Sequence, residues 1–170
     1  RVAIDPYTQD VWLTIGDSKH RLMLRSEDHG VTWREISRNQ ATAVAFDEKG
    51  IYWGMDKIGM AGVMRYDRQT EKFKTVFDPR ETRYHPEHLG TNYGGSIYDM
   101  LRLDSGELIV PFMKYADQDH VASVWMGKGE QWRLLMTLDS EQGKGKAISS
   151  IAGPDQQGWV YWPDYQMKLQ

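Results

Sequence analysis

The chain has 170 residues, the size of one ordinary domain. Apolar residues make up 40% of it, with seven Trp and nine Tyr, which is enough to bury a core and excludes a disordered tail. The net charge is −3 and no long basic run occurs, so a nucleic-acid partner is not expected. The absence of cysteine excludes disulfides and thiolate zinc sites. No apolar run approaches the roughly 20 residues of a membrane-spanning helix.

A short hairpin pattern recurs four times along the chain. Each copy is an apolar strand, a turn rich in Asp, Gly, Pro or Ser, and a second strand rich in β-branched and aromatic residues. The copies lie at 2–15, 44–55, 101–112 and 151–162. Their turns align on Asp5, Asp47, Asp104 and Asp155, which are 42, 57 and 51 residues apart. Spacing of this size is typical of a four-stranded propeller blade with variable loops.

The segments between the hairpins supply a third and a fourth strand for each copy. They lie at 21–25 and 32–36, at 62–67 and 72–77, and at 121–127 and 131–138. The expected fold class is therefore all-β, with propeller blades of four antiparallel strands named A to D in chain order; a generic antiparallel sandwich is the alternative. The blades are expected at about 1–38, 41–78 and 96–139, with an incomplete blade at 147–170 that ends after strand B.

About three and a half blades do not close a ring, and an unclosed stack exposes strand edges. We therefore expect the chain to be part of a six- or seven-bladed ring. The remaining blades would come from the same longer chain or from an oligomer partner.

The stretch SEDHGVTW at 26–33 lies between strands C and D of the first copy. It matches the pattern Ser-x-Asp-x-Gly-x-Thr-Trp through Ser26, Asp28, Gly30, Thr32 and Trp33. Asp28 suits a turn because its carboxylate accepts hydrogen bonds from backbone N–H groups, and Gly30 allows a positive φ. Trp33 is expected to fold back under the hairpin as an apolar plug. We expect a structural role for these five residues.

This motif resembles the Asp-box, or BNR, repeat of sialidase-like propellers. The resemblance implies a β-propeller and, in many members, work on carbohydrates. The other C–D turns keep parts of the motif: Asp67 and Phe73 in the second copy, Gly129 and Trp132 in the third. The arginine triad and the N-terminal Phe-Arg-Ile-Pro-like segment of sialidases proper have no match in this sequence.

Propellers usually bind ligands on the side opposite the Asp box, where the B–C and D–A loops lie. The B–C loops are expected at 16–21, 55–62, 114–120 and 163–166, and the D–A loops at 37–42, 78–96 and 139–147. The loop at 78–96 is long enough to suggest function, although a surface insertion or a contact between blades is the alternative. Its cations and rings suit an acidic sugar, because Arg binds carboxylates bidentately. The candidate substrate-binding residues are Arg80, Arg83, Tyr84, His85, His88, Tyr93, Lys114 and His120.

A glycoside hydrolase would need two carboxylates, or a Tyr with a Glu partner, across a pocket. Asp17, Asp56, Asp99, Asp117 and Glu87 are available on this side. The catalytic candidates are Asp99, Asp56 and Tyr98, and the alternative for Tyr98 is a packed, channel-lining aromatic.

No cofactor is expected. His85 and His88 have the spacing H-x-x-H, but Pro86 indicates an extended loop with two exposed histidines. A divalent metal there would take Glu87, Asp117 and His120 as further ligands.

Three functions follow as hypotheses. The first is a carbohydrate-active propeller, a glycoside hydrolase or lyase acting on an acidic poly- or oligosaccharide. The second is a non-catalytic module that binds glycan or protein in a phage or cell-surface protein, and the third is a scaffold or assembly role. An extracellular, periplasmic or phage-particle location is favoured over the cytoplasm.

Overall fold

The computed structural model describes residues 1–56, 62–84, 87, 93–113, 121–138, 150–162 and 165–168. The first sheet contains β1 (Val2–Ile4), β2 (Val11–Ile15), β3 (Leu22–Ser26) and β4 (Arg34–Ser37). The second contains β5 (Ala41–Asp47), β6 (Gly50–Met55), β7 (Val63–Asp67) and β8 (Lys72–Phe77). The third contains β9 (Leu101–Arg102), β10 (Leu108–Phe112), β11 (Ala122–Lys128) and β12 (Gln131–Leu138). The fourth contains β13 (Trp159–Trp162) and β14 (Tyr165–Lys168), and two short 3-10 turns are η1 (Ser18–His20) and η2 (Thr82–Tyr84).

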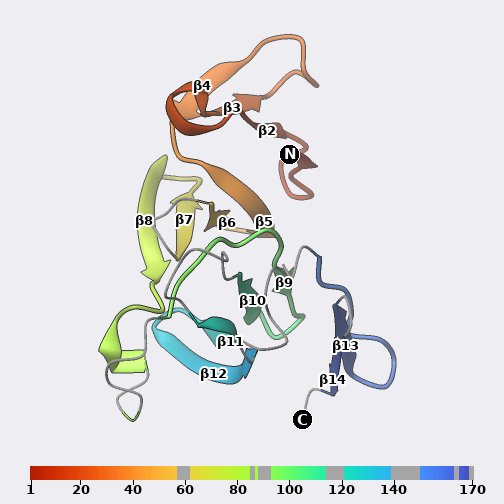
Figure 1. Cartoon of the computed structure of the whole chain (residues 1–170). Helices are drawn as coiled ribbons and strands as arrows, with labels where there is room; N and C mark the ends of the chain where they lie inside the picture. The colour runs from red at the N-terminus through yellow and green to blue at the C-terminus, as the bar shows by residue number, and fades with distance from the viewer. Residues whose placement is uncertain are drawn as a thin grey trace.

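Each sheet is antiparallel and its strands are neighbours in chain order, as hairpin connections require. The predicted all-β class with four-stranded blades is confirmed. Figure 1 shows the sheets following one another in an arc, from the first sheet at the top of the view to β13 and β14 at the lower right.

The fourth copy of the repeat corrects one expectation. The prediction of a loop at 163–166 was wrong for Tyr165 and Gln166. These two residues belong to β14, which pairs with β13. The copy therefore continues beyond its second strand. Its expected first strand is reduced to an isolated bridge between Ala152 and Tyr161.

The sheets pack face to face through side chains that alternate along the second strand of each sheet. On β6, Ile51, Trp53 and Met55 point back to the first sheet and form a buried cluster with Trp12 and Met23. The rings of Trp12 and Trp53 are 5.7 Å apart between centroids. Because alternate residues point to opposite faces, a central sheet can be covered by a neighbour on both sides.

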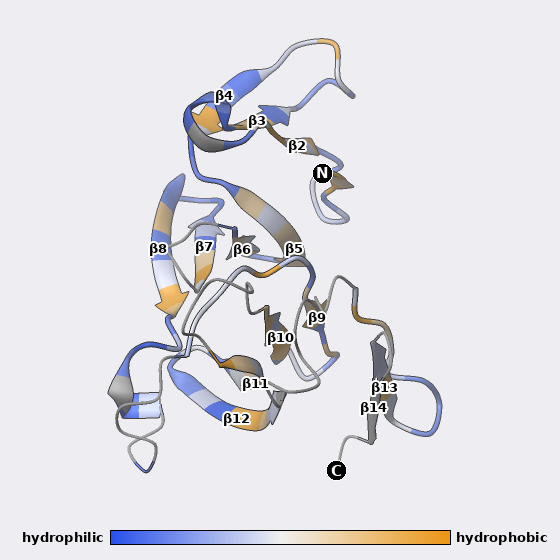
Figure 2. Cartoon of the chain, viewed as in Figure 1, coloured by the Kyte–Doolittle hydropathy of each residue, from blue (hydrophilic) through white to orange (hydrophobic). Residues whose placement is uncertain are grey.

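Phe77, at the end of β8, is the centre of the joint between the second and third sheets. Its ring is stacked on Trp132 with 4.0 Å between centroids, and it contacts Trp125 and Phe112 at 5.3 and 5.9 Å. Figure 2 shows hydrophilic colour along most of β8 and hydrophobic colour at its end, where the strand meets the third sheet. On the other face of the third sheet, Ile109 joins a cluster with side chains of the fourth sheet.

The C–D turn of the first sheet is held by the Asp28 carboxylate and the Ser26 hydroxyl. The hydroxyl and the N–H of Thr32 donate to Asp28 at 2.6 and 2.8 Å, and Ser26 donates to it at 2.7 Å. The N–H of Gly30, whose φ is 93°, donates to the Ser26 hydroxyl at 2.7 Å. Trp33 differs from the expected plug: its indole N–H donates to the Gly30 carbonyl at 3.0 Å, but the residue is 40% exposed.

Replacing Phe77 by Ala is expected to lower the free energy of unfolding by about 3–5 kcal/mol, because the buried ring is lost and a cavity remains between two sheets. Lys74→Ala is the matched control, since Lys74 is exposed on the same strand, and its effect is expected within about 0.5 kcal/mol. Urea unfolding followed by tryptophan fluorescence measures both. Effects of equal size would contradict a packed joint at Phe77.

The pKa of Asp28 is lowered from an ordinary value of 3.8 to about 2, chiefly by the hydrogen bond from the Thr32 hydroxyl, then by the Thr32 N–H and the Ser26 hydroxyl. Because the folded-state pKa is depressed, the ionised carboxylate stabilises the fold above pH of about 4, and this contribution is lost as the pH falls to about 2. The difference in unfolding free energy between the wild type and Asp28→Asn should therefore be constant near neutral pH and shrink over that window. Urea unfolding at a series of pH values measures it, and a difference that persists unchanged at pH 2 would refute the assignment.

Candidate functional site

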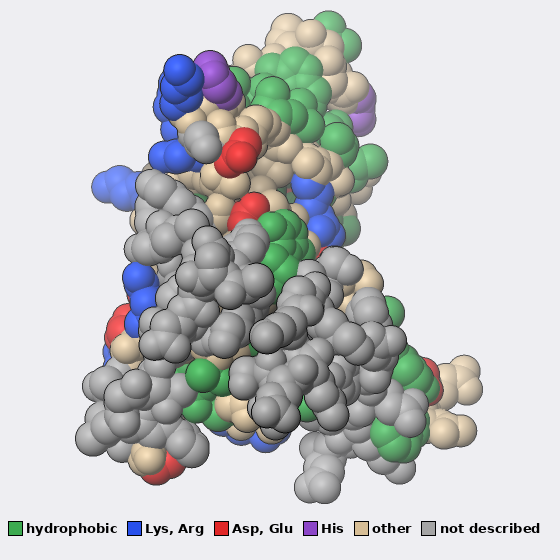
Figure 3. All heavy atoms as spheres, in the orientation of Figure 1, with side chains coloured by type: hydrophobic (Ala, Val, Ile, Leu, Met, Phe, Trp, Pro, Cys, Tyr) green, Lys and Arg blue, Asp and Glu red, His purple; other side chains and the backbone are tan. Residues whose placement is uncertain are grey.

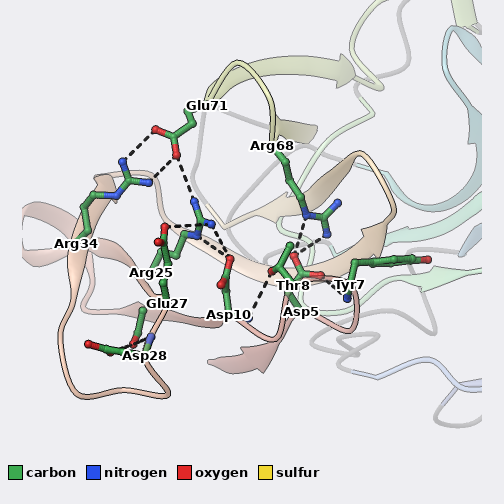
Figure 4. Close-up of polar contacts among 11 residues, drawn as sticks. Asp5, Tyr7, Thr8, Asp10, Arg25, Glu27, Asp28, Arg34, Arg68 and Glu71 are labelled. Atoms are coloured by element: carbon green, nitrogen blue, oxygen red, sulfur yellow. Dashed lines mark hydrogen bonds and ion pairs between the residues drawn. The ribbon is translucent and has the colours of Figure 1, made fainter.

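Charged side chains form a network of ion pairs at the end of the first two sheets that carries the turn 26–33 (Figure 4). Arg25 on β3 contacts Asp10 at 2.7 Å and Glu27 at 3.1 Å. Glu71, from the turn between β7 and β8, accepts from Arg25 at 3.2 Å and from Arg34 on β4 at 2.7 Å. These pairs join the second sheet to the first. A hollow of about 430 Å³ lies here, and the charged side chains that line it pair with one another.

A separate buried ion pair lies at the same end of the two sheets, between Arg68, just after β7, and Asp5, just after β1. The Asp5 carboxylate is 1% exposed and accepts two hydrogen bonds from Arg68, at 2.6 and 3.0 Å, and one from the N–H of Tyr7 at 3.0 Å. Arg68 also donates to the carbonyl of Asp47 and lies over the Tyr7 ring, 5.3 Å from its centroid. The charges at this end hold two sheets together, which is a structural role.

A cleft of about 530 Å³ lies at the opposite end of the same two sheets. Antiparallel pairing places it roughly 15 Å from the turn 26–33, at the other end of β3. Its lining comes from the start of the chain, the B–C loops of the first two sheets and the connection between those sheets: Arg1, Thr14, Ile15, Gly16, Asp17, Asn39, Gln40, Ala41, Thr42 and Asp56.

Hydrogen bonds fix the polar wall of this cleft. The Gln40 side-chain amide donates to the Asp56 carboxylate at 3.3 Å, and the Asp56 N–H donates to the Gln40 carbonyl at 2.9 Å. Gly16 has a φ of 76°, and a Cβ at this position would overlap the carbonyl of His20, so the turn into the loop requires glycine. With Asp17 also in the lining, the cleft offers two carboxylates beside side-chain amides and hydroxyls, a set that both donates and accepts hydrogen bonds.

Arg1, at the edge of the cleft, ties together the inner strands of neighbouring sheets. Its guanidinium donates to the carbonyls of Thr42 and Tyr98, each at 3.1 Å, and to the carboxylate of Asp99 at 3.0 Å. The same carboxylate accepts the N–H of Ile151 at 3.3 Å. Asp99 therefore connects segments of the first, third and fourth sheets. The candidate Asp56 lines the cleft itself, and Asp99 is not among its lining residues.

The two described arginines of the loop at 78–96 pair with carboxylates of the same loop. Arg80 contacts Asp78 at 2.5 Å, and Arg83 contacts Glu81 at 2.6 Å. Tyr84 packs against the cluster between the second and third sheets, and Tyr93 is buried within that cluster. Of the predicted binding residues in this loop, the two tyrosines thus pack between sheets.

The other candidates fall outside the described residues: His85, His88, Lys114, Asp117 and His120. Glu87 is described and exposed. Within the described ranges, no group of three or more His, Asp or Glu residues is placed to hold a metal ion. The same part of the chain contains no helix with the length and apolar character that crossing a membrane requires.

Sequence reasoning had identified the loops that form the cleft but not most of its residues. Asn39, Gln40 and Thr42 were part of a predicted D–A loop and carried no motif. Arg1 was missed because its partner Asp99 is 98 residues away. Their positions in the repeat could have indicated the contact, because Arg1 and Asp99 both lie just before the first strand of their sheet.

No family model matches this chain, and no curated protein matches it. Among solved structures, a β-propeller chain in "Crystal structure of Nidogen/Laminin Complex" matches with a TM-score of 0.53 and 17% sequence identity over 80% of this chain. The chain spans 47% of that propeller chain, about half its length. The likeness shows the fold. The sheets are blades of a β-propeller.

Replacing Arg68 by Met is expected to destabilise the protein by about 3–5 kcal/mol, because the buried Asp5 carboxylate loses its charged partner. Arg38→Met is the control, since Arg38 pairs with Glu35 at the exposed surface and such pairs contribute at most about 1 kcal/mol. Thermal and urea unfolding measure both variants. If Arg68→Met loses no more stability than the control does, the pair of Arg68 with Asp5 does not hold the first two sheets together.

Proposed function

We propose that this chain is the ligand-binding arc of a carbohydrate-directed propeller, and that its cleft between the first two blades binds a hydroxyl-rich glycan. The observation that carries the proposal is the lining of that cleft. Carboxylate, amide and hydroxyl groups converge on a cleft of about 530 Å³, within the size range of small-molecule sites. Sugar hydroxyls both donate and accept, and this lining supplies partners of both kinds.

The charge of the cleft favours a neutral glycan over the acidic one expected from the sequence. The lining of the cleft contains two carboxylates, Asp17 and Asp56, and one guanidinium, that of Arg1. The Arg1 guanidinium already contacts the carboxylate of Asp99. The arginines that suggested an acidic sugar, Arg80 and Arg83, contact carboxylates of their own loop. A ligand carboxylate in the cleft would meet like charge, which disfavours binding.

The Asp-box resemblance also supports a carbohydrate ligand. The five motif residues form a closed turn with the contacts that their chemistry predicts for Ser26, Asp28, Gly30 and Thr32. We therefore propose a relationship to the sialidase-like propellers. The turn orients the blade, so the proposed ligand side is the end away from it.

Glycoside hydrolysis is the second candidate function. One observation favours it: Asp17 and Asp56 come from the B–C loops of different blades and line the same cleft. Hydrolysis of a glycosidic bond uses two carboxyl groups, one as acid and one as base or nucleophile. An assay for products released from a bound oligosaccharide distinguishes hydrolysis from binding without catalysis.

A glycan array that contains neutral and acidic oligosaccharides tests the proposal, followed by titration of the best ligand. Asp56→Asn is expected to weaken binding by about tenfold or more, because a hydrogen bond to a charged group contributes about 1.5–3 kcal/mol. The asparagine oxygen can still accept from Gln40, so the wall of the cleft is preserved. The double variant Arg80→Ala, Arg83→Ala is the control and should bind as the wild type does.

Loss of binding in the arginine double variant, with Asp56→Asn unaffected, would move the site to the loop at 78–96 and overturn the proposal. Binding to no glycan, with saturable binding on a protein array, would replace the carbohydrate by a protein ligand.

A further inference from the structure

Three arginines of the first two sheets are largely buried, and each contacts a carboxylate. Their side chains are between 14% and 16% exposed. The pairs are Arg25 with Asp10 at 2.7 Å, Arg65 with Asp47 at 3.2 Å and Arg68 with Asp5 at 2.6 Å. A guanidinium that is removed from water loses hydration free energy, which a carboxylate partner offsets. Exposed cations stay hydrated, and Figure 3 shows Lys and Arg side chains of this kind gathered over β4 and β8, along the left side of the view.

Arg102, on the first strand of the third sheet, is partly buried but has no carboxylate partner. Its Nε is fully buried and makes no hydrogen bond. Among the residues that the structure describes, no carboxylate lies within ion-pair distance of its guanidinium. Its neighbour on β10, Leu108, is 1% exposed and packs in the cluster between the second and third sheets. The other face of the third sheet packs on the fourth, so Arg102 belongs to a sheet with a neighbouring sheet on each face.

A second cation, the ammonium group of Lys128 at the end of β11, lies beside the turn that follows Arg102. Its Nζ donates to the carbonyl of Ser105 at 2.9 Å. A Cβ at Gly106 would lie 2.9 Å from this Nζ and 3.6 Å from Nη2 of Arg102. The two cationic groups therefore flank one point of the turn between β9 and β10, where Gly106 has a φ of 83° and no side chain. Two like charges this close repel each other, and an anion that contacts both relieves the repulsion.

The acidic residues of this turn do not neutralise the two cations. Glu107 accepts a hydrogen bond from the hydroxyl of Ser105 at 2.9 Å. Asp104 is exposed to solvent. Neither carboxylate forms an ion pair with Arg102 or Lys128 in the part of the chain that the structure describes. The turn therefore keeps two positive charges together without a negative partner in contact with them.

We propose that Arg102 and Lys128, with the turn 104–106, form a binding site for a tetrahedral oxyanion, sulfate or phosphate, either free or as an ester. A guanidinium can donate two parallel N–H bonds to such an anion, and a lysine ammonium adds a point charge. Two cations match the two negative charges that sulfate carries and that a phosphate monoester approaches at neutral pH. The first and last turns of a blade lie at the same end of its antiparallel strands. This site is therefore at the end away from the proposed glycan cleft and does not depend on it.

An NMR titration with sodium sulfate, at an ionic strength held constant with sodium chloride, tests this proposal. The amide signals of Ser105, Gly106 and Lys128 should shift and reach saturation. Arg102→Gln, and independently Lys128→Gln, should raise the dissociation constant by about tenfold or more, because each removes a charge-assisted hydrogen bond. Arg133→Gln is the matched control, since Arg133 is an exposed cation on the same sheet, and it should bind sulfate as the wild type does. Shifts that never saturate, or that are equal in all four proteins, would overturn the proposal.

Thermal unfolding of Arg102→Met distinguishes a binding role from a structural one. Without sulfate, this variant should melt no lower than the wild type, because it loses a partly buried charge that has no partner. Sulfate should raise the melting temperature of the wild type more than that of the variant, since only the wild type binds it. A variant that melts lower without sulfate and gains as much from sulfate as the wild type would make Arg102 structural and overturn the proposal.

A sulfated monosaccharide and its unsulfated parent identify the source of the oxyanion. Tighter binding of the sulfated sugar than of inorganic sulfate would support the proposal with an ester as the ligand, and weaker binding would support it with the free ion. Equal binding of the sulfated and unsulfated sugars would show that the oxyanion is not recognised and would contradict the site.

Discussion

The stacking of Phe77 on Trp132 illustrates the packing on which the whole arrangement depends. Each sheet is too thin to bury apolar side chains by itself, so it must be covered by neighbours on its two faces. Alternation along the second strand satisfies this requirement, because successive residues point to the preceding and the following sheet. The arc of blades and the positions of the turns follow from that alternation.

The two ends of the joint between the first two blades differ chemically. At the end that carries the turn 26–33, the turns of the two sheets meet through ion pairs, among them the buried contact of Arg68 with Asp5. At the other end, the loops of the same sheets leave a cleft whose wall is held by the contact of Gln40 with Asp56. One joint between blades thus provides both a structural rim and a candidate binding site.

The sequence predicted the local parts of this structure better than the distant ones. Strand alternation and turn chemistry are local, so the four-stranded sheets and the contacts of Asp28 followed from short stretches. The exposure of Trp33 did not, because it depends on whether another sheet covers it. The contact of Arg1 with Asp99 joins residues far apart in the chain, and no local pattern encodes it. The carboxylates beside Arg80 and Arg83 were visible in the sequence, and their spacing could have indicated pairing within the loop.

The strand β14 was not predicted because its sequence, YQMK, has little apolar alternation and follows a Pro-Asp pair that is typical of a turn. Its pairing depends on β13, whose own position is fixed by burial against the third sheet. Tertiary packing here overrides a weak local signal.

The proposed ligand site is the cleft between the first two blades, at the end away from the turn 26–33. Backbone amide shifts in an NMR titration with a neutral oligosaccharide can map this site residue by residue. Binding in the cleft should perturb amides that cluster at residues 14–17, at 39–42 and at Asp56. Perturbations that cluster at residues 26–33 instead would place the ligand at the opposite end of the blades and refute the proposed site.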